Sequence, residues 1–287
     1  MMRISEINIY PIKSLKGISV DSAVIERHGL KYDRRWLLLD ANGTFMTQRE
    51  VPKMATVSVA IRENGLLVTA DGITAMVVPF EPQNGEEIVA EVWGTKSRAI
   101  AYGGGVDAWF SQVLGLECKL VFMPDDAGRE INELFNAGDD VVSFADGYPQ
   151  LLIGEASLAD INKKLAGETP AVRLEMNRFR PNIVVDTTEA FAEDDWKRIK
   201  IGDAVFRSTK PCARCVMTTV DQAMGEFTGK EPLKTLSTYR LAKDVIHDRY
   251  GSFGMSPNAV CFGQNLVAES IGSTINVGDE VEILESY

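Results

Sequence analysis

Residues 36–48 read WLLLDANGTFMTQ, and this stretch decides the fold class. The apolar run Trp36–Asp40 has the length of a buried strand, and Asn42-Gly43 is the dipeptide most typical of a two-residue hairpin turn. We expect Thr44–Gln48 to return beside the first strand. A strand, a tight turn and a second strand in so short a stretch indicate antiparallel β structure.

The same pattern extends along the first half of the chain. Residues 6–9 (EINI) alternate polar and apolar side chains with the period of two that a half-buried strand shows. No helical period interrupts this series, so we expect mainly β structure with some α, beginning with a β-barrel domain over residues 1–122. Two more hairpins are predicted, one from Leu66–Thr69 and Ile73–Phe80 around Asp71-Gly72, and one from Ile88–Trp93 and Arg98–Tyr102.

The pattern changes after Gly103-Gly104-Gly105. Asp107 is expected to cap a short helix that ends near Leu114 and buries Trp109, Phe110 and Val113. A strand over Lys119–Met123 and a polar surface loop over Pro124–Asp140 are expected next, with the domain boundary near the start of that loop.

Residues 123–287 are expected to form a second, β-rich domain. A helix over Ser157–Leu165 and a buried strand over Ile183–Asp186 are predicted. Residues 199–206 and 275–282 resemble each other, since each reads as strand, Gly-Asp turn and strand. Residues 235–247 fit either a helix or irregular structure.

Composition excludes several function classes. The net charge of −11 makes nucleic acid and anionic membrane poor partners, because both are bound mainly through Lys and Arg. No apolar run is long enough to span a bilayer, and Glu6 interrupts the only candidate signal peptide, so we expect a cytoplasmic protein. Two histidines argue against a metal site built mainly from imidazole, but leave a Ser-His or Cys-His pair open.

The sharpest local feature is residues 210–215, KPCARC, which place Cys212 and Cys215 beside Lys210 and Arg214. Neighbouring positive charge favours thiolate, the form that attacks or binds a metal. A structural zinc site lacks a second C-x-x-C pair, and a thioredoxin-like dithiol should precede a helix, whereas a β-branched strand is expected here. Packing of the two thiols as small hydrophobes and ligation of a cofactor-borne metal by a single thiolate remain open.

Other polar clusters are uninformative when taken one at a time. Together, they resemble the motifs of one protein family. Ordered along the chain are YPIKSLKG (10–17), YDRRW (32–36), TQREVP (47–52), FADGYP (144–149), GEASLADIN (154–162), FRPNIVVD (179–186), IGDAVF (201–206), KPCARC (210–215), TTVDQ (218–222), EPLKTL (231–236), FGQNL (262–266) and VGDEVEIL (277–284). In this order the motifs resemble the MOSC proteins, especially bacterial YcbX-type proteins and the mitochondrial amidoxime reducing component.

This resemblance implies an N-terminal β-barrel domain, a MOSC domain and a molybdenum cofactor between them. The cofactor is a pterin with a dithiolene and a terminal phosphate, which needs cationic or backbone donors. The family's molybdenum ligand falls on the second cysteine of the motif, Cys215, which is also the expected catalytic residue, and Cys212 has no assigned role. The cofactor-binding positions fall on Lys13, Ser14, Arg34, Tyr148, Arg180, Asn182, Ala213 and Cys215.

Two departures from the family pattern matter. Gly147-Tyr148 stands where the mitochondrial relatives have small hydroxylated residues, which leaves the role of Tyr148 open. The chain ends at Tyr287 without the ferredoxin-like domain of longer relatives, and its four cysteines supply no ferredoxin cluster motif. Electrons are therefore expected from a separate protein, such as a ferredoxin or a cytochrome with its reductase.

By resemblance, the expected activity is reduction of small N-hydroxylated compounds from N–OH to N–H, with water as the second product. A non-enzymatic cofactor carrier or sulfur-delivery module is the alternative, and a thiol redox protein using Cys212 and Cys215 is a third hypothesis. The sequence leaves the natural substrate, the identity of the electron donor and the oligomeric state open.

Overall fold

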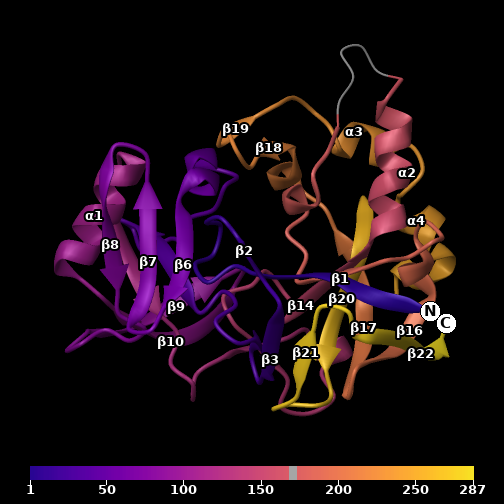
Figure 1. The fold of residues 1–287 in the computed structure, drawn as a ribbon, viewed down its shortest axis with the longest axis horizontal. Coiled ribbons are helices and arrows are strands. Elements are labelled where there is room, and N and C mark those ends of the chain that lie inside the picture. Colours follow the sequence, from indigo (N-terminus) through magenta and orange to yellow (C-terminus); the bar gives the residue numbers. More distant parts are fainter. Residues whose placement is uncertain (168–172) are drawn as a thin grey trace.

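The computed structural model describes residues 1–167 and 173–287 and shows a mainly β protein, as predicted. Two halves lie side by side (Figure 1). The half drawn in purple contains most of the first 122 residues, and the other half contains a β-barrel with helix α2 on its outside. Among the residues described, no helix is long and apolar enough to cross a membrane.

The N-terminal half is built from two antiparallel sheets and one helix. The two hairpins predicted over residues 66–80 and 88–102 are confirmed, with the tight turns closed by the pairs Ala70–Ile73 and Val92–Thr95. Helix α1 (Gly104–Leu114) buries Trp109 and Phe110 in the core of this half. The sheets consist of β5 (Trp36–Asp40), β11 (Cys118–Phe122), β10 (Thr95–Ala101) and β9 (Glu87–Val92), in that order, and of β6 (Ser58–Arg62), β7 (Gly65–Ala70) and β8 (Ile73–Val78).

The return strand predicted over Thr44–Gln48 forms only in part. The backbone nitrogen of Asp40 donates to the carbonyl of Thr44, that of Met46 donates to the carbonyl of Leu38, and Phe45 forms a bridge to Leu39. The chain then leaves the sheet. Asp40 closes the turn, because its Oδ1 accepts hydrogen bonds from the backbone nitrogens of Asn42 and Thr44. The side chain of Gln48 is buried against the C-terminal half instead, so tertiary contacts override the hairpin pattern.

The predicted cap of helix α1 is wrong. The helix begins after Gly103, and Asp107 lies inside its first turn. The Oδ1 of Asp107 accepts a hydrogen bond of 2.9 Å from the backbone nitrogen of Leu120 in β11. Asp107 thus ties the helix to the sheet, and Gly103 is the N-cap residue in its place.

A closed barrel of seven strands forms the core of the C-terminal half. Strand β1 (Met2–Ile9) pairs with β22 (Glu280–Ser286) on one side and β15 (Ile183–Val185) on the other, which closes the barrel. The first strand of the chain therefore lies among strands that come from beyond residue 149. The order is β15, β14 (Gln150–Gly154), β20 (Cys261–Ala268), β17 (Ala204–Ala213), β16 (Trp196–Ile201), β22 and β1, with β2 (Ile18–Val20) at the edge of β1.

The two segments that resemble each other fold differently. Residues 199–206 form the predicted hairpin between β16 and β17, closed by the pair Ile201–Ala204. Residues 275–282 do not, because β21 (Thr274–Asn276) pairs with β3 (Ser22–Glu26) while β22 pairs with β16 and β1. Similar sequences thus give different pairings, since the neighbouring strands decide the register.

Shorter elements surround the barrel. Helix α2 (Glu155–Leu165) is confirmed and buries Ile161 and Leu165, and the segment left open contains α3 (Leu233–Leu236) and α4 (Ala242–Val245). The loop expected over residues 124–140 is largely irregular, but Arg129 is buried there and donates to the carbonyls of Ser143 and Ala145. The remaining strands are β4 (Gly29–Leu30), β12 (Arg129–Glu130), β13 (Val141–Val142), β18 (Val220–Asp221) and β19 (Glu226–Phe227), and 3₁₀ helices cover Pro52–Thr56, Glu133–Phe135, Met176–Arg178, Ala192–Asp195, Val216–Thr219 and His247–Tyr250.

Candidate functional site

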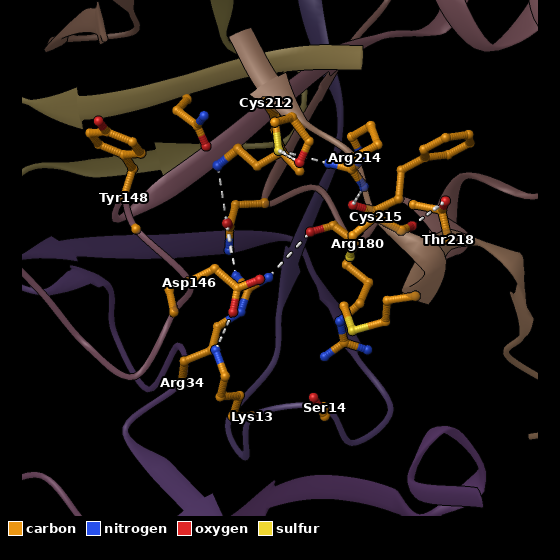
Figure 2. A pocket seen from close by; sticks show the side chains of 18 of the residues that line it. Lys13, Ser14, Arg34, Asp146, Tyr148, Arg180, Cys212, Arg214, Cys215 and Thr218 are labelled. Atoms are coloured by element: carbon orange, nitrogen blue, oxygen red, sulfur yellow. Dashed lines mark hydrogen bonds and ion pairs between the residues drawn. The ribbon is translucent and has the colours of Figure 1, made fainter. Parts of the chain in front are cut away.

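One cavity of about 150 Å³ lies where the two halves meet (Figure 2). Every residue that the resemblance assigned to the cofactor lines it. They reach it from the loop after β1, the turn before β5, the segments before β14 and β15, and the end of β17. The set consists of Lys13, Ser14, Arg34, Tyr148, Arg180, Asn182, Ala213 and Cys215.

Three of these residues have an unusual backbone conformation. Ser14, Arg34 and Arg180 have positive φ angles of 66°, 49° and 54°. Residues other than glycine rarely adopt this left-handed region, and they do so at a free-energy cost that clusters at functional sites. The backbone therefore directs these side chains into the cavity, a feature that the sequence did not reveal.

The ring of Tyr10 packs against the guanidinium groups of Arg34 and Arg180. The guanidinium carbons of Arg34 and Arg180 both lie 4.2 Å from the centre of its ring. Arg34 is held further by the carboxylate of Asp33 at 2.6 Å and the Oδ1 of Asn182 at 2.9 Å. Arg180 is buried, and its Nη2 has no hydrogen-bond partner in the described structure. Burial lowers the pKa of Arg180 to about 10, because the charged guanidinium is poorly solvated. An anion bound in the cavity would stabilise this buried cation.

Asn182 connects the barrel to the cavity. Its Oδ1 accepts from Arg34 and from the backbone nitrogen of Leu151, and its Nδ2 donates to the carbonyl of Asn8. These contacts join β14 and β1 to Arg34. The orientation of Arg34 thus depends on closure of the barrel.

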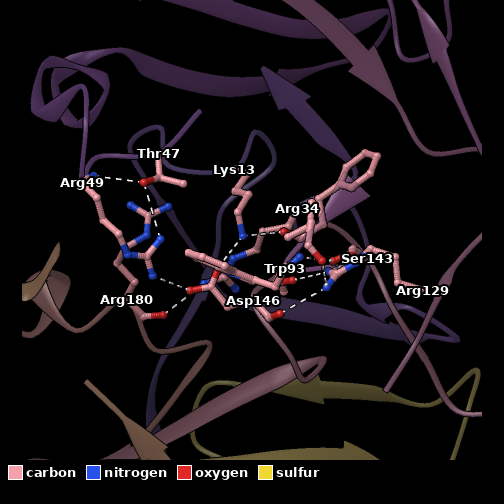
Figure 3. A network of polar contacts seen from close by, with 12 residues as sticks. Lys13, Arg34, Thr47, Arg49, Trp93, Arg129, Ser143, Asp146 and Arg180 are labelled. Carbon is pink, nitrogen blue, oxygen red and sulfur yellow. Dashed lines mark hydrogen bonds and ion pairs between the residues drawn. The ribbon is translucent and has the colours of Figure 1, made fainter. Parts of the chain in front are cut away.

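Asp146 is the centre of a polar network at the cavity (Figure 3). It pairs with Lys13, whose Nζ also donates to the carbonyl of Phe144 at 2.7 Å, and it accepts from Arg49 and Trp93 at 3.2 Å each. Burial lowers the pKa of Lys13 to about 8, although the carboxylate opposes the shift. Burial would favour the neutral acid at Asp146, but Lys13 and Arg49 hold its pKa far below the usual range.

The two cysteines have different surroundings. Cys212 lies near the end of β17, packs against the apolar cluster around Phe179 and Phe262, and accepts a contact of 2.9 Å from Arg214 Nη1. Cys215 precedes the 3₁₀ helix Val216–Thr219, so the expectation that a β-branched strand directly follows it is wrong. Its carbonyl accepts from the backbone nitrogen of Thr218, and this satisfied carbonyl stabilises the tight turn in place of a strand. Both thiols are free.

Among the residues described, Tyr148 lines the cavity, whereas the two histidines do not. Tyr148 reaches the cavity and is 9% exposed, and Lys210 Nζ lies 5.7 Å from its ring centre. Burial raises the pKa of Tyr148 above its usual value. Neither His28 nor His247 is among the residues that line the cavity in the described structure, so no Cys-His pair forms there.

Sequence reasoning missed two charged residues of the cavity, Arg49 and Asp146. They stand in the motifs TQREVP and FADGYP, but nothing in those motifs showed that their side chains converge. Arg214, which the sequence placed beside the two cysteines, also lines the cavity. The lining then includes five cationic side chains, from Lys13, Arg34, Arg49, Arg180 and Arg214, against the single carboxylate of Asp146. In a chain of net charge −11, this concentration of positive charge fits an anionic ligand.

Comparison with known proteins gives the family. Residues 1–117 match the MOSC N-terminal beta barrel domain and residues 139–282 match the MOSC domain. The predicted boundary between residues 122 and 123 falls between the two matches and stays a prediction.

Named relatives match over almost the whole chain. Mitochondrial amidoxime reducing component 2 of Bos taurus is 36% identical over 287 residues, which cover 97% of this chain and 82% of that protein. Mitochondrial amidoxime-reducing component 1 is 33% identical in both Mus musculus and Homo sapiens, over 98% of this chain and 82% of each protein. The chain therefore belongs to the MOSC family, among the members in which an N-terminal β-barrel domain precedes the MOSC domain.

Proposed function

We propose that this protein is a molybdenum-cofactor-dependent reductase of N-hydroxylated compounds that takes its electrons from a separate protein. One observation carries the proposal: the fold brings Cys215 and a cluster of cationic side chains from both halves into one cavity. The names of the relatives, amidoxime-reducing components, support the reaction class.

The cavity suits such a cofactor chemically. Arg180 has a buried Nη2 without a partner, and a phosphate oxygen is the kind of acceptor that would satisfy it. Lys13, Ser14 and Arg34 would complete the phosphate site. Tyr148, Asn182 and Ala213 would contact the pterin, and the cofactor would supply the two-electron reduction of N–OH.

In this proposal, Cys215 is the protein's ligand to the metal. In the described parts of the chain, no three His, Cys, Asp or Glu side chains gather in a way that could hold a metal ion. A metal at Cys215 would therefore take its other ligands from a cofactor, and the dithiolene of the pterin is a soft ligand pair of the same kind as a thiolate. The buried side chains of Phe179 and Leu151 add apolar surface to the same cavity.

The decisive experiment separates a reductase from a carrier. Protein made in a host that synthesises the cofactor is analysed for molybdenum and then assayed on benzamidoxime with an artificial one-electron donor. Bound molybdenum with turnover supports the proposal. Full molybdenum occupancy without turnover by any donor would favour the carrier or sulfur-delivery module. Cytoplasmic localisation remains a further proposal, which imaging of a tagged protein tests.

A further inference from the structure

Arg49 is a charged residue of the cavity to which neither the family motif nor the proposed cofactor site gives a role. Its side chain is 16% exposed and lies on the loop that leaves the N-terminal sheet after Phe45. Its Nη2 donates to Asp146 at 3.2 Å, and its backbone nitrogen donates to the hydroxyl of Thr47 at 3.1 Å (Figure 3). The guanidinium is thus fixed in orientation rather than free in solvent.

Trp93 supports this arginine. The guanidinium carbon of Arg49 lies 4.7 Å from the centre of the Trp93 ring, and Phe45 packs edge-on against the same ring at 4.9 Å. Trp93 is 54% exposed and has a φ of 52° at the tip of the β9–β10 hairpin. Within the described residues, Trp93 contacts Phe45, Arg49 and Asp146, so this strained and exposed residue packs at the edge of the polar network rather than in the core.

The other side of Arg49 faces Cys215. Both residues line the same cavity, and Cys215 acts together with Asp146 to raise the pKa of Arg49 against the opposing effect of burial. The planar guanidinium presents its donors in a fixed fork toward the carboxylate and the sulfur, whereas an ammonium is a point charge on a flexible stem. Cys212 has its own arginine, since its sulfur contacts Arg214. Each cysteine of the motif is thus matched by a different arginine.

The backbone beside Arg49 is anchored as well. The neighbouring Gln48 is fully buried, and its Nε2 donates to the carbonyl of Ser14 at 2.7 Å. This contact fixes the loop relative to the predicted phosphate-binding segment. Displacement of the loop that carries Arg49 would therefore break buried hydrogen bonds.

We propose that Arg49, supported by the indole of Trp93, is a positioning residue that holds the Cys215 sulfur in place for its metal. The inference rests on the proposed function, because it assigns Arg49 to the metal end of the cavity and leaves the phosphate to Arg180. Arg49 acts through Cys215 and Asp146, and its loss should alter the surroundings of the metal without emptying the site.

The test compares Arg49→Gln, Arg49→Lys and Trp93→Ala with the wild-type protein produced in a cofactor-synthesising host. Molybdenum content should stay within twofold of wild type, while the Mo(V) electron paramagnetic resonance signal shifts. In Arg49→Gln, kcat should fall about tenfold or more, as expected for the loss of a charge-assisted hydrogen bond, with a smaller change in KM. Arg49→Lys should recover part of kcat, because it keeps the charge beside Asp146.

Arg98→Gln is the control, since Arg98 lies on the β9–β10 hairpin that carries Trp93 and pairs on the surface with Glu87 and Asp126. It should behave as wild type. An unchanged signal and unchanged kcat in Arg49→Gln would overturn the inference. Loss of molybdenum with an unshifted residual signal, as expected for Arg180→Ala, would also overturn it, because Arg49 would then be an anchor. Wild-type protein without molybdenum would overturn the proposed function itself.

Discussion

The side-chain amides of Gln48 and Gln222 hydrogen-bond each other in both directions, with Nε2–Oε1 distances of 3.2 and 2.9 Å. Gln48 belongs to the N-terminal half, and Gln222 follows β18 in the C-terminal half. Both side chains are buried, and the pair lies directly beside Arg49 and Ser14. The two halves are thus joined by a satisfied polar contact at the edge of the cavity.

This amide pair should contribute measurably to stability. Gln48→Ala leaves the Gln222 amide buried without its partner, so the free energy of unfolding should fall by about 1–3 kcal/mol. The double variant with Gln222→Ala should lose less than the sum of the two single variants. Urea denaturation measures both effects, with the exposed Gln112→Ala as control. Strictly additive losses would show that the two amides do not interact.

The two cysteines should differ in importance. Cys215→Ala should abolish reductase activity and alter the metal centre, because it removes the proposed protein ligand. Cys212→Ala should keep much of both, since Cys212 packs beside Phe179 and contacts Arg214. Activity assays and molybdenum analysis of both variants decide this. Equal inactivation would favour a dithiol mechanism instead.

The cationic anchors should affect cofactor content. Arg180→Ala, Arg34→Ala and Lys13→Ala should each lower molybdenum occupancy. Arg180→Ala gives the clearest test, because its Nη2 has no hydrogen-bond partner among the described residues. Arg34→Ala should also destabilise the fold, by about 3–5 kcal/mol, because it leaves the fully buried carboxylate of Asp33 unpaired. Occupancy and thermal unfolding are measured together. Full occupancy in all three variants would place the phosphate elsewhere.

Cofactor retention should depend on pH through Lys13. Burial places the pKa of Lys13 at about 8, so its positive charge is present below this pH and is lost as the pH rises through it. Loaded protein dialysed at pH 9.5 should lose cofactor faster than at pH 7. Lys13→Arg should remove this dependence, because arginine stays protonated over the whole range. Identical retention curves for wild type and variant would exclude Lys13 as the titrating anchor.

The source of electrons can be tested directly. The sequence has no flavin or nicotinamide fingerprint, since Gly103-Gly104-Gly105 lacks the G-x-G-x-x-G pattern, and it has no iron–sulfur motif. Pure protein with NADH alone should therefore not reduce benzamidoxime. A ferredoxin or cytochrome with its reductase should restore turnover, at a rate that depends on ionic strength. Turnover with NADH alone would exclude the need for a protein donor.

Much of the secondary structure followed from local patterns. The hairpin around Asp71-Gly72 was predictable because its short loop and apolar strands act locally. The hairpin of residues 88–102 was also predicted, but its tight turn at Trp93-Gly94 was not located. The pairing of residues 44–48 and 275–282 was not predictable in full, because contacts with distant parts of the chain decide it. The membership of β1 in the C-terminal barrel was missed for the same reason.

For the candidate site too, the sequence identified some features and long-range contacts decided the others. The sequence by itself determined the motif residues, from Lys13 to Cys215, because a resemblance depends only on residue identity and order. Only the tertiary structure brought Asp146 between Lys13 and Arg49, and Arg49 into the same cavity as Cys215. These contacts join segments far apart in the chain, and no local spacing encodes them. Strand pairing across the closed barrel and the left-handed backbone at Ser14, Arg34 and Arg180 decide where those side chains meet.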